Sequence, residues 1–342
     1  MSLTDTGHFQ VFSQVNSSLI RDPVLVVSEL TKVYPGRPPT TAVDRLSFAL
    51  GRREILGLLG PNGAGKTTTI QMLLSTLRPT SGEISYFGQS LRAARATILA
   101  QVGFASAYSR LPRRLTVIEN LDVFARLYGL RAGERASRIR ELLERFGVWD
   151  LRRRSMESLS AGQATRVMLA KAFLARPRVA LLDEPTASLD PDIAVEVRAF
   201  VRSQRDEEGV SIVFTSHNMD EVAQLCDRVI FLDRGRIAAS GHPEELAASA
   251  AMTRVRLRVT HGLDRLLGHV EAAGLASARD DGTVEVEIDE SHLADFLASL
   301  AQAGVRYREI TLRKPTLEDY FLKLAGTAMG ARTRQPAREE ES

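Results

Sequence analysis

Cysteine is nearly absent from this sequence, and so is any long apolar run. The single cysteine, Cys226, excludes an intrachain disulfide, which suits a reducing compartment. It lies in the apolar-spaced segment EVAQLCDRV, so we expect a small buried core residue rather than a reactive thiol. No window offers about 18 consecutive apolar residues, so we expect no segment that spans a bilayer. If the protein serves a membrane process, another chain must supply the membrane part.

An excess of charge of either sign is also missing. The chain has 45 basic and 42 acidic side chains, a net charge of +3, which is too small a surplus to indicate nucleic-acid binding. The arginine run at 152–154 is typical of a solvated helix face. The first residues lack the basic start and apolar stretch of a signal peptide. We therefore expect no nucleic-acid partner and no secretory leader.

The 342 residues are more than one hydrophobic core usually holds, so the length predicts two domains. From Val24 to about Leu246, short apolar runs alternate with helical patterns, which indicates an α/β fold with a largely parallel sheet. The runs ILGLL (55–59) and VALLD (179–183) are typical of strands covered on both faces. The arginine-rich region at about 91–165 has a helical pattern, and we expect an inserted helical subdomain there.

A different pattern follows the linker-like stretch GHPEELAASAAM. Alternating and helical spacings predict the order β-α-β-β-α-β of a split βαβ, ferredoxin-like unit. A last helix is expected to start at Thr316, with Asp319 as its capping-box partner, and to stop at Gly326. The predicted division is a flexible tail (1–22), a first domain (23–248), a small second α/β domain (249–326) and a disordered tail (327–342).

The segment GPNGAGKTT (60–68) matches the phosphate-loop pattern G-x-x-x-x-G-K-[ST], with a predicted strand before it and a helix after it. Glycines let the backbone wrap phosphates, Lys66 reaches the β- and γ-phosphates, and Thr67 offers a hydroxyl to Mg²⁺. The predicted nucleotide-binding residues of this loop are Gly60, Pro61, Asn62, Gly63, Ala64, Gly65, Lys66, Thr67 and Thr68.

The segment VALLDEP places two carboxylates at the end of a buried strand. We expect Asp183 to hold Mg²⁺, directly or through water, and Glu184 to polarise the attacking water. Alone, such a pair would more often be a turn or a helix cap. Together with the phosphate loop it predicts hydrolysis.

A second anion site is indicated by LSAGQ, about a hundred residues after the loop. Ser160 is a natural helix N-cap, and the small residues after it leave backbone N–H groups accessible. The sequence pattern alone does not say whose phosphate this site holds.

In order, the phosphate loop, LSAGQ, VALLDEP, ASLD and TSH resemble the nucleotide-binding subunit of the ATP-binding cassette (ABC) family over about residues 24–246. The resemblance implies a P-loop NTPase fold that binds ATP and Mg²⁺. It also implies that two such domains pair head to tail, so the signature helix of one caps the γ-phosphate held by the other. The signature residues acting on the partner's nucleotide would be Ser160, Ala161, Gly162 and Gln163.

The same resemblance assigns further roles. Tyr34 would stack on adenine, although a strand-end aromatic packed on the core is the alternative. His217 would contact the γ-phosphate as a switch residue, where a lone histidine would otherwise be structural. Ser188 and Asp190 would lie at the dimer seam, where they would otherwise indicate a turn. The catalytic set implied is Glu184, His217 and Lys66.

Two positions depart from the family pattern. Ala161 stands where a glycine is usual, which raises the question of backbone strain. Ala107 stands where the family has a glutamine that touches Mg²⁺ and senses the membrane partner. Either a water replaces that side chain, or Ser106 or Ser109 substitutes for it. This departure concerns coupling to a partner rather than ATP binding.

The single cassette and the ending PTLEDYFLKLAG resemble the export-type, drug-resistance-like bacterial branch. The resemblance implies an ATPase at the inner, cytoplasmic face of the cell membrane, paired with an integral membrane permease and with a second copy of itself or a homologous ATPase subunit. An import ATPase of the same family, and a non-transport ATPase acting on ribosomes or nucleic acid, remain alternatives. A binding-only regulator is disfavoured because the hydrolytic motifs are intact. The transported substrate is not indicated.

Overall fold

The chain divides into two compact units between His242 and Pro243. The predicted boundary after residue 248 lies a few residues later, inside helix α8 (Pro243–Ala250), so this linker helix belongs to the second unit. Among the described residues, no helix is both long and apolar enough to cross a membrane. The predicted tails fall mostly outside the described part of the chain. The computed structural model describes residues 22–107, 109–250, 252–280 and 283–330.

The main sheet of the first unit has six strands in the order β10-β9-β3-β8-β7-β6. Five of them are parallel, and β10 is antiparallel to β9. Every residue of β3, β7 and β8 is buried, which confirms the buried strands expected at 55–59 and 179–183. The strands are β3 (Ile55–Leu59), β6 (Val102–Ser106), β7 (Val179–Asp183), β8 (Ser211–Thr215), β9 (Arg228–Asp233) and β10 (Arg236–Gly241).

A second, antiparallel sheet in this unit has the order β2-β1-β4-β5 and was not expected from the sequence. One apolar core joins it to the main sheet, with Phe48 and Tyr86 fully buried in it. The Tyr86 hydroxyl donates to the Leu73 carbonyl of α1 at 3.1 Å, and α1 also contacts β2 and β7, so this helix packs against both sheets. The strands are β1 (Leu25–Tyr34), β2 (Thr40–Leu50), β4 (Ser81–Tyr86) and β5 (Gln89–Ser90).

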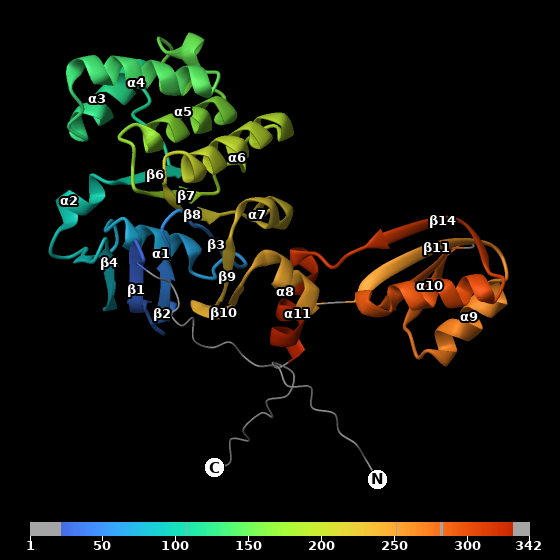
Figure 1. The fold of residues 1–342 in the computed structure, drawn as a ribbon. Coiled ribbons are helices and arrows are strands. Elements are labelled where there is room, and N and C mark those ends of the chain that lie inside the picture. Colours follow the sequence, from blue (N-terminus) through green and yellow to red (C-terminus); the bar gives the residue numbers. More distant parts are fainter. Residues whose placement is uncertain (1–21, 108, 251, 281–282, 331–342) are drawn as a thin grey trace, which may run out of the picture. The chain divides into compact units, whose positions relative to one another are not determined.

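Helices α3, α4 and α5 contact one another, and α5 contacts β6; Figure 1 shows them grouped beside β6 and β7. The expectation of helices alone over 91–165 is wrong for Val102–Ser106, which is strand β6. A Cβ at Gly103 would lie 2.2 Å from the Ala172 carbonyl of α5, so close packing requires a glycine that weakens the strand signal. The helices are α1 (Lys66–Leu73), α2 (Arg95–Leu99), α3 (Val117–Leu127), α4 (Ala132–Arg145), α5 (Ala161–Phe173), α6 (Pro191–Asp206) and α7 (Met219–Leu225), with 3-10 turns at Trp149–Leu151 and Met156–Ser158.

The second unit follows the predicted order β-α-β-β-α-β, and its antiparallel sheet has the order β12-β13-β11-β14. Its apolar core combines β11 and β13 with α9 and α10. The ferredoxin-like assignment of this unit stays a prediction. The elements are β11 (Thr253–His261), α9 (Leu263–Ala272), β12 (Ser277–Asp280), β13 (Thr283–Ile288), a 3-10 turn at Glu290–His292, α10 (Leu293–Gln302), β14 (Arg306–Arg313) and α11 (Leu317–Gly330).

Helix α11 begins where predicted and ends later than predicted. The Thr316 hydroxyl accepts from the Asp319 N–H at 3.2 Å, and the Asp319 carboxylate accepts from the Thr316 N–H at 2.8 Å. The predicted stop at Gly326 is wrong, because α11 continues to Gly330; a glycine inside a helix costs only about 1 kcal/mol.

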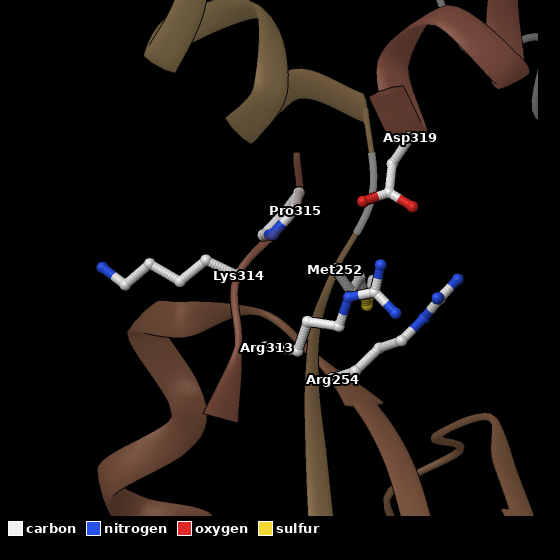
Figure 2. A pocket seen from close by; sticks show the side chains of 6 residues that line it. All are labelled: Met252, Arg254, Arg313, Lys314, Pro315 and Asp319. Atoms are coloured by element: carbon white, nitrogen blue, oxygen red, sulfur yellow. The ribbon is translucent and has the colours of Figure 1, made fainter. Parts of the chain in front are cut away.

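The start of α11 is also tied to the sheet by charge. Figure 2 shows Asp319 above the guanidinium groups of Arg254 and Arg313, which come from β11 and β14. Burial raises the pKa of Asp319, but hydrogen bonds from Thr316 and the two arginine charges outweigh it and hold the pKa below its usual range. The carboxylate therefore stays ionised and links the helix to both strands.

Candidate nucleotide site

The phosphate loop connects β3 to α1, and two of its glycines are required by space as well as by backbone angle. Gly60 has φ 143° and Gly65 has φ 102°, which disfavour any side chain. A Cβ at Gly60 would lie 2.3 Å from the Leu232 carbonyl, and one at Gly65 would lie 2.5 Å from the Ala42 carbonyl. The loop backbone is therefore packed directly against β9 and β2.

Lys66 is the first residue of α1, and the loop curls around its ammonium. Its Nζ donates to the Gly60 carbonyl at 2.5 Å and to the Pro61 carbonyl at 3.1 Å. The pKa of Lys66 lies below its usual value, because burial lowers it by more than the charges of Glu184 and Asp183 raise it. No side chain caps the N-terminus of α1, so its first N–H groups can bind an anion.

The acidic end of β7 lies between the ends of β6 and β8. Ser106, Asp183 and Thr215 are directly opposite one another in the parallel register. The Asp183 carboxylate is buried, and it accepts from the Thr215 hydroxyl at 2.7 Å and from the Ser106 hydroxyl at 3.3 Å. The contact of Thr215 with Asp183 was not expected from the sequence, because the two residues are 32 positions apart in the chain.

Glu184, the residue after Asp183, lies next to His217. The Nδ1 atom of His217 lies 2.7 Å from Oε2 of Glu184, and the His217 N–H donates to the same oxygen at 3.3 Å. The Glu184 backbone N–H donates to the Thr215 hydroxyl at 3.0 Å, and its φ of 52° is uncommon for a non-glycine residue. The glutamate is 7% exposed and the histidine side chain 72% exposed, so one partner is fixed and the other reaches solvent.

The signature segment forms a complete helix cap. The Ser160 hydroxyl accepts from the Gln163 N–H at 3.3 Å, and the Gln163 side chain accepts from the Ser160 N–H at 3.1 Å. Ala161 is not among the residues with positive φ, so alanine fits there without strain. A Cβ at Gly162 would lie 3.1 Å from the Ser188 carbonyl, so this glycine packs against the ASLD segment.

Tyr34, Asp190 and Ala107 lie on three other segments of the first unit. Tyr34 is the last residue of β1 and is 37% exposed. The Lys32 ammonium lies 5.3 Å from the centre of its ring. Asp190 is the exposed N-cap residue of α6 and makes no side-chain capping bond. Ala107 offers only its backbone N–H, which donates to the Asp183 carbonyl at 3.2 Å. Of the two serines considered as substitutes for glutamine, Ser106 contacts the Asp183 carboxylate.

The structure thus groups Lys66, Asp183, Glu184 and His217 around the phosphate loop. Within the described residues, no hydrogen bond joins the signature residues 160–163 to the loop at 60–68. One chain therefore presents two helix N-termini, those of α1 and α5, that no described hydrogen bond joins.

Comparison with known proteins finds one family across this region. A family model described as "ABC transporter" matches residues 43–187. The daunorubicin/doxorubicin resistance ATP-binding protein DrrA of Streptomyces peucetius is 34% identical over 92% of this chain and 96% of its own length. The Nod factor export ATP-binding protein I of Ralstonia nicotianae is 34% identical over 90% of this chain and 95% of its own. A solved ATP-binding subunit of an ABC transporter, 28% identical, superposes with a TM-score of 0.61 over 66% of this chain and 92% of that chain.

Proposed function

The chain belongs to the ATP-binding proteins of the ABC transporter family, and we propose that its ATP hydrolysis drives export through a separate membrane permease. ATP binding and hydrolysis are the activities of this family. The observation that carries the export proposal is the extent of the similarity. One relative named for drug resistance and one named for Nod factor export match 92% and 90% of this chain, so the similarity includes the second unit.

The phosphate loop is assigned to the β- and γ-phosphates, and Thr67 and Asp183 to Mg²⁺. A hydroxyl and a carboxylate are oxygen donors of the kind that Mg²⁺ takes alongside nucleotide phosphates. Two hydroxyls orient the Asp183 carboxylate, which supports this assignment. When bound, Mg²⁺ would neutralise phosphate charge.

Glu184 is assigned as the general base. Its Oε2 is held by His217, so Oε1 remains to accept the proton of the attacking water. The exposed imidazole of His217 is directed by the same contact and leaves Nε2 for the γ-phosphate. The contact thereby orients the side chains of Glu184 and His217 together.

Ser160 to Gln163 are assigned to the nucleotide of a second copy or of a homologous ATPase subunit. The capping box occupies the Gln163 N–H and leaves the N–H groups of Ala161 and Gly162 for an anion. The absence of a hydrogen bond to the loop of the same chain, among the described residues, is consistent with this use across an interface. Tyr34 and Asp190 keep their proposed roles at adenine and at the dimer seam.

The permease is proposed to dock beside the signature helix. A cavity of about 230 Å³ lies between the segment that follows β6 and the start of α5, and Ala107, Arg110, Arg113 and Met168 line part of it. Its lining combines apolar side chains and two arginines with the single acidic residue Glu157, which suits an amphipathic, partly acidic loop of a membrane protein. Docking there would hold the chain on the cytoplasmic face of the membrane.

The experiment is a tagged purification from detergent-solubilised membranes of the host, with wild type and an Arg110→Glu/Arg113→Glu variant compared. We expect a polytopic membrane protein to copurify with the wild type and to be reduced about tenfold with the variant, while ATPase activity of the isolated protein stays unchanged. An exposed pair on β14, Arg306→Glu/Arg308→Glu, is the control for charge alone. Recovery of ribosomal proteins or nucleic acid in place of a permease would overturn the transport proposal and leave the ATPase assignment standing.

A further inference from the structure

Glu221 is a buried carboxylate that none of the assignments above uses. It lies in the first turn of α7, is 3% exposed, and its backbone N–H donates to the Asn218 side chain at 3.1 Å. A buried charge is costly unless hydrogen bonds and counter-charges surround it. The partners of this carboxylate therefore indicate what it is for.

Its partners come from two loops and one helix. The hydroxyls of Thr186 and Ser216 both donate to Oε2, each at 2.8 Å. On the other oxygen, Oε1, the Arg198 guanidinium lies 3.5 Å away. The Ser216 hydroxyl in turn accepts the Asn218 N–H at 3.1 Å, so the network closes on itself.

The two hydroxyls belong to the loops that carry the catalytic pair. Thr186 follows Glu184 by two residues, and Ser216 immediately precedes His217. A single carboxylate oxygen thus holds both loops at one point, next to the 2.7 Å contact between Glu184 and His217. Arg198 adds α6, the helix that Asp190 precedes.

We propose that Glu221 is a positioning residue for hydrolysis: it sets the separation of the Glu184 and His217 loops and so the orientation of the general base. This inference rests on the roles proposed for Glu184 and His217. Among the described residues, no hydrogen bond joins Glu221 to either of their side chains, so it acts through Thr186 and Ser216. A displacement of about 1 Å in a reacting group can cost on the order of a hundredfold in rate.

The test uses steady-state ATPase kinetics of the full chain, with nucleotide affinity and thermal midpoint measured on the same samples. We expect Glu221→Gln to lower kcat by at least about tenfold while KM for ATP stays within about twofold. The matched control is Glu196→Gln on the exposed face of α6, which should change neither. A lower kcat accompanied by weaker ATP binding and a lower thermal midpoint would show a merely structural role and overturn the proposal. An unchanged kcat would overturn it as well.

The two hydroxyl partners keep the proposal testable if Glu221→Gln does not fold. Thr186→Val and Ser216→Ala should each lower kcat by about threefold to tenfold, whereas the hydroxyl-retaining Thr186→Ser and Ser216→Thr should keep it near the wild-type value. Failure of either hydroxyl-retaining variant to restore kcat would count against the hydrogen bonds to Oε2.

Glu184→Gln, measured in parallel, separates this inference from the assignment on which it rests. If Glu184→Gln hydrolyses ATP normally, the assignment of Glu184 is wrong and the positioning role falls with it. If Glu184→Gln is inactive while Glu221→Gln is normal, only the role of Glu221 is overturned.

Discussion

At the residue scale, the site depends on a few groups that close packing and hydrogen bonds hold in place. The glycines at 60 and 65 lie within van der Waals reach of carbonyls, and Lys66 is held by two loop carbonyls. Glu184 has its backbone fixed by Thr215 and one carboxylate oxygen fixed by His217. Such pre-organisation is what electrostatic and acid–base catalysis requires.

Glu184→Gln should abolish most turnover and leave ATP binding intact. The amide cannot accept a proton from water, and general acid–base groups typically contribute about 10²–10⁴-fold. ATPase rates and size-exclusion chromatography with ATP would show slow hydrolysis together with an ATP-stabilised dimer. The exposed Glu207→Gln is the control and should behave as wild type; normal hydrolysis by Glu184→Gln would remove this residue from its role.

At the element scale, α5 combines an exposed functional start with a buried body. Its N-terminus presents the signature residues, while Lys171 in its last turn is buried between α3 and β6. The Lys171 ammonium lies 5.5 Å from the ring centre of Phe104 and 5.4 Å from that of Phe124. Burial lowers its pKa to about 8. Keeping this charge buried lowers the folding stability of the helical region.

The pH dependence of stability follows from that pKa. Below pH 8 both the folded and the unfolded chain carry the proton, and the cost of the buried charge is fully present. Between pH 8 and the unfolded value of 10.5 the unfolded chain binds more protons, so stability rises with pH. Lys171→Met should therefore stabilise the first unit at pH 7 by about 1–2 kcal/mol, since a shift of this size is worth up to about 3 kcal/mol and lost cation–π contacts offset part of it.

Trp149 is the single tryptophan and lies beside α4, so its fluorescence during urea unfolding reports on this region. The difference between Lys171→Met and wild type should shrink as the pH is raised from 7 to 9.5. The exposed Lys314→Met, in the second unit, is the control. A destabilised Lys171→Met at pH 7 would mean that the two aromatic contacts outweigh the burial cost.

At the scale of the whole molecule, the proposed arrangement gives each chain two half-sites, and no hydrogen bond within the described residues joins them. The phosphate loop with its acidic partners is one half, and the capped signature helix is the other. A head-to-tail pair of chains would complete two sites. The second unit, from Pro243, has its own apolar core and is matched by the full-length relatives.

Mixing Ser160→Arg with Lys66→Ala chains should restore activity. Each variant alone is inactive at both sites, because Ser160→Arg blocks the anion-binding helix start and Lys66→Ala removes the phosphate ligand. In a mixed dimer one site receives an intact loop and an intact signature helix. We expect the mixture to recover up to about a quarter of wild-type ATPase activity when chains pair at random and sites act independently. No recovery, with heterodimers verified by two affinity tags, would contradict sharing of sites between chains.

Short stretches of sequence encode several features of this protein. A strand, a glycine-rich turn and a helix follow one another at 55–73, and the cap at Ser160 needs only Gln163. The buried strand before Asp183 and the cap at Thr316 are local in the same way. Hydrogen bonds and apolar runs within a few residues suffice for them, so pattern alone predicted them.

The contacts between distant side chains depend on the tertiary structure. Ser106 and Thr215 reach Asp183 because β6, β7 and β8 are adjacent and in register, although they are far apart in the chain. Glu221 joins the Thr186 and Ser216 loops through a buried carboxylate that the sequence shows merely as an acidic residue in a helix. Strand order and register are set by packing of the whole core, and no periodicity within a single segment contains them.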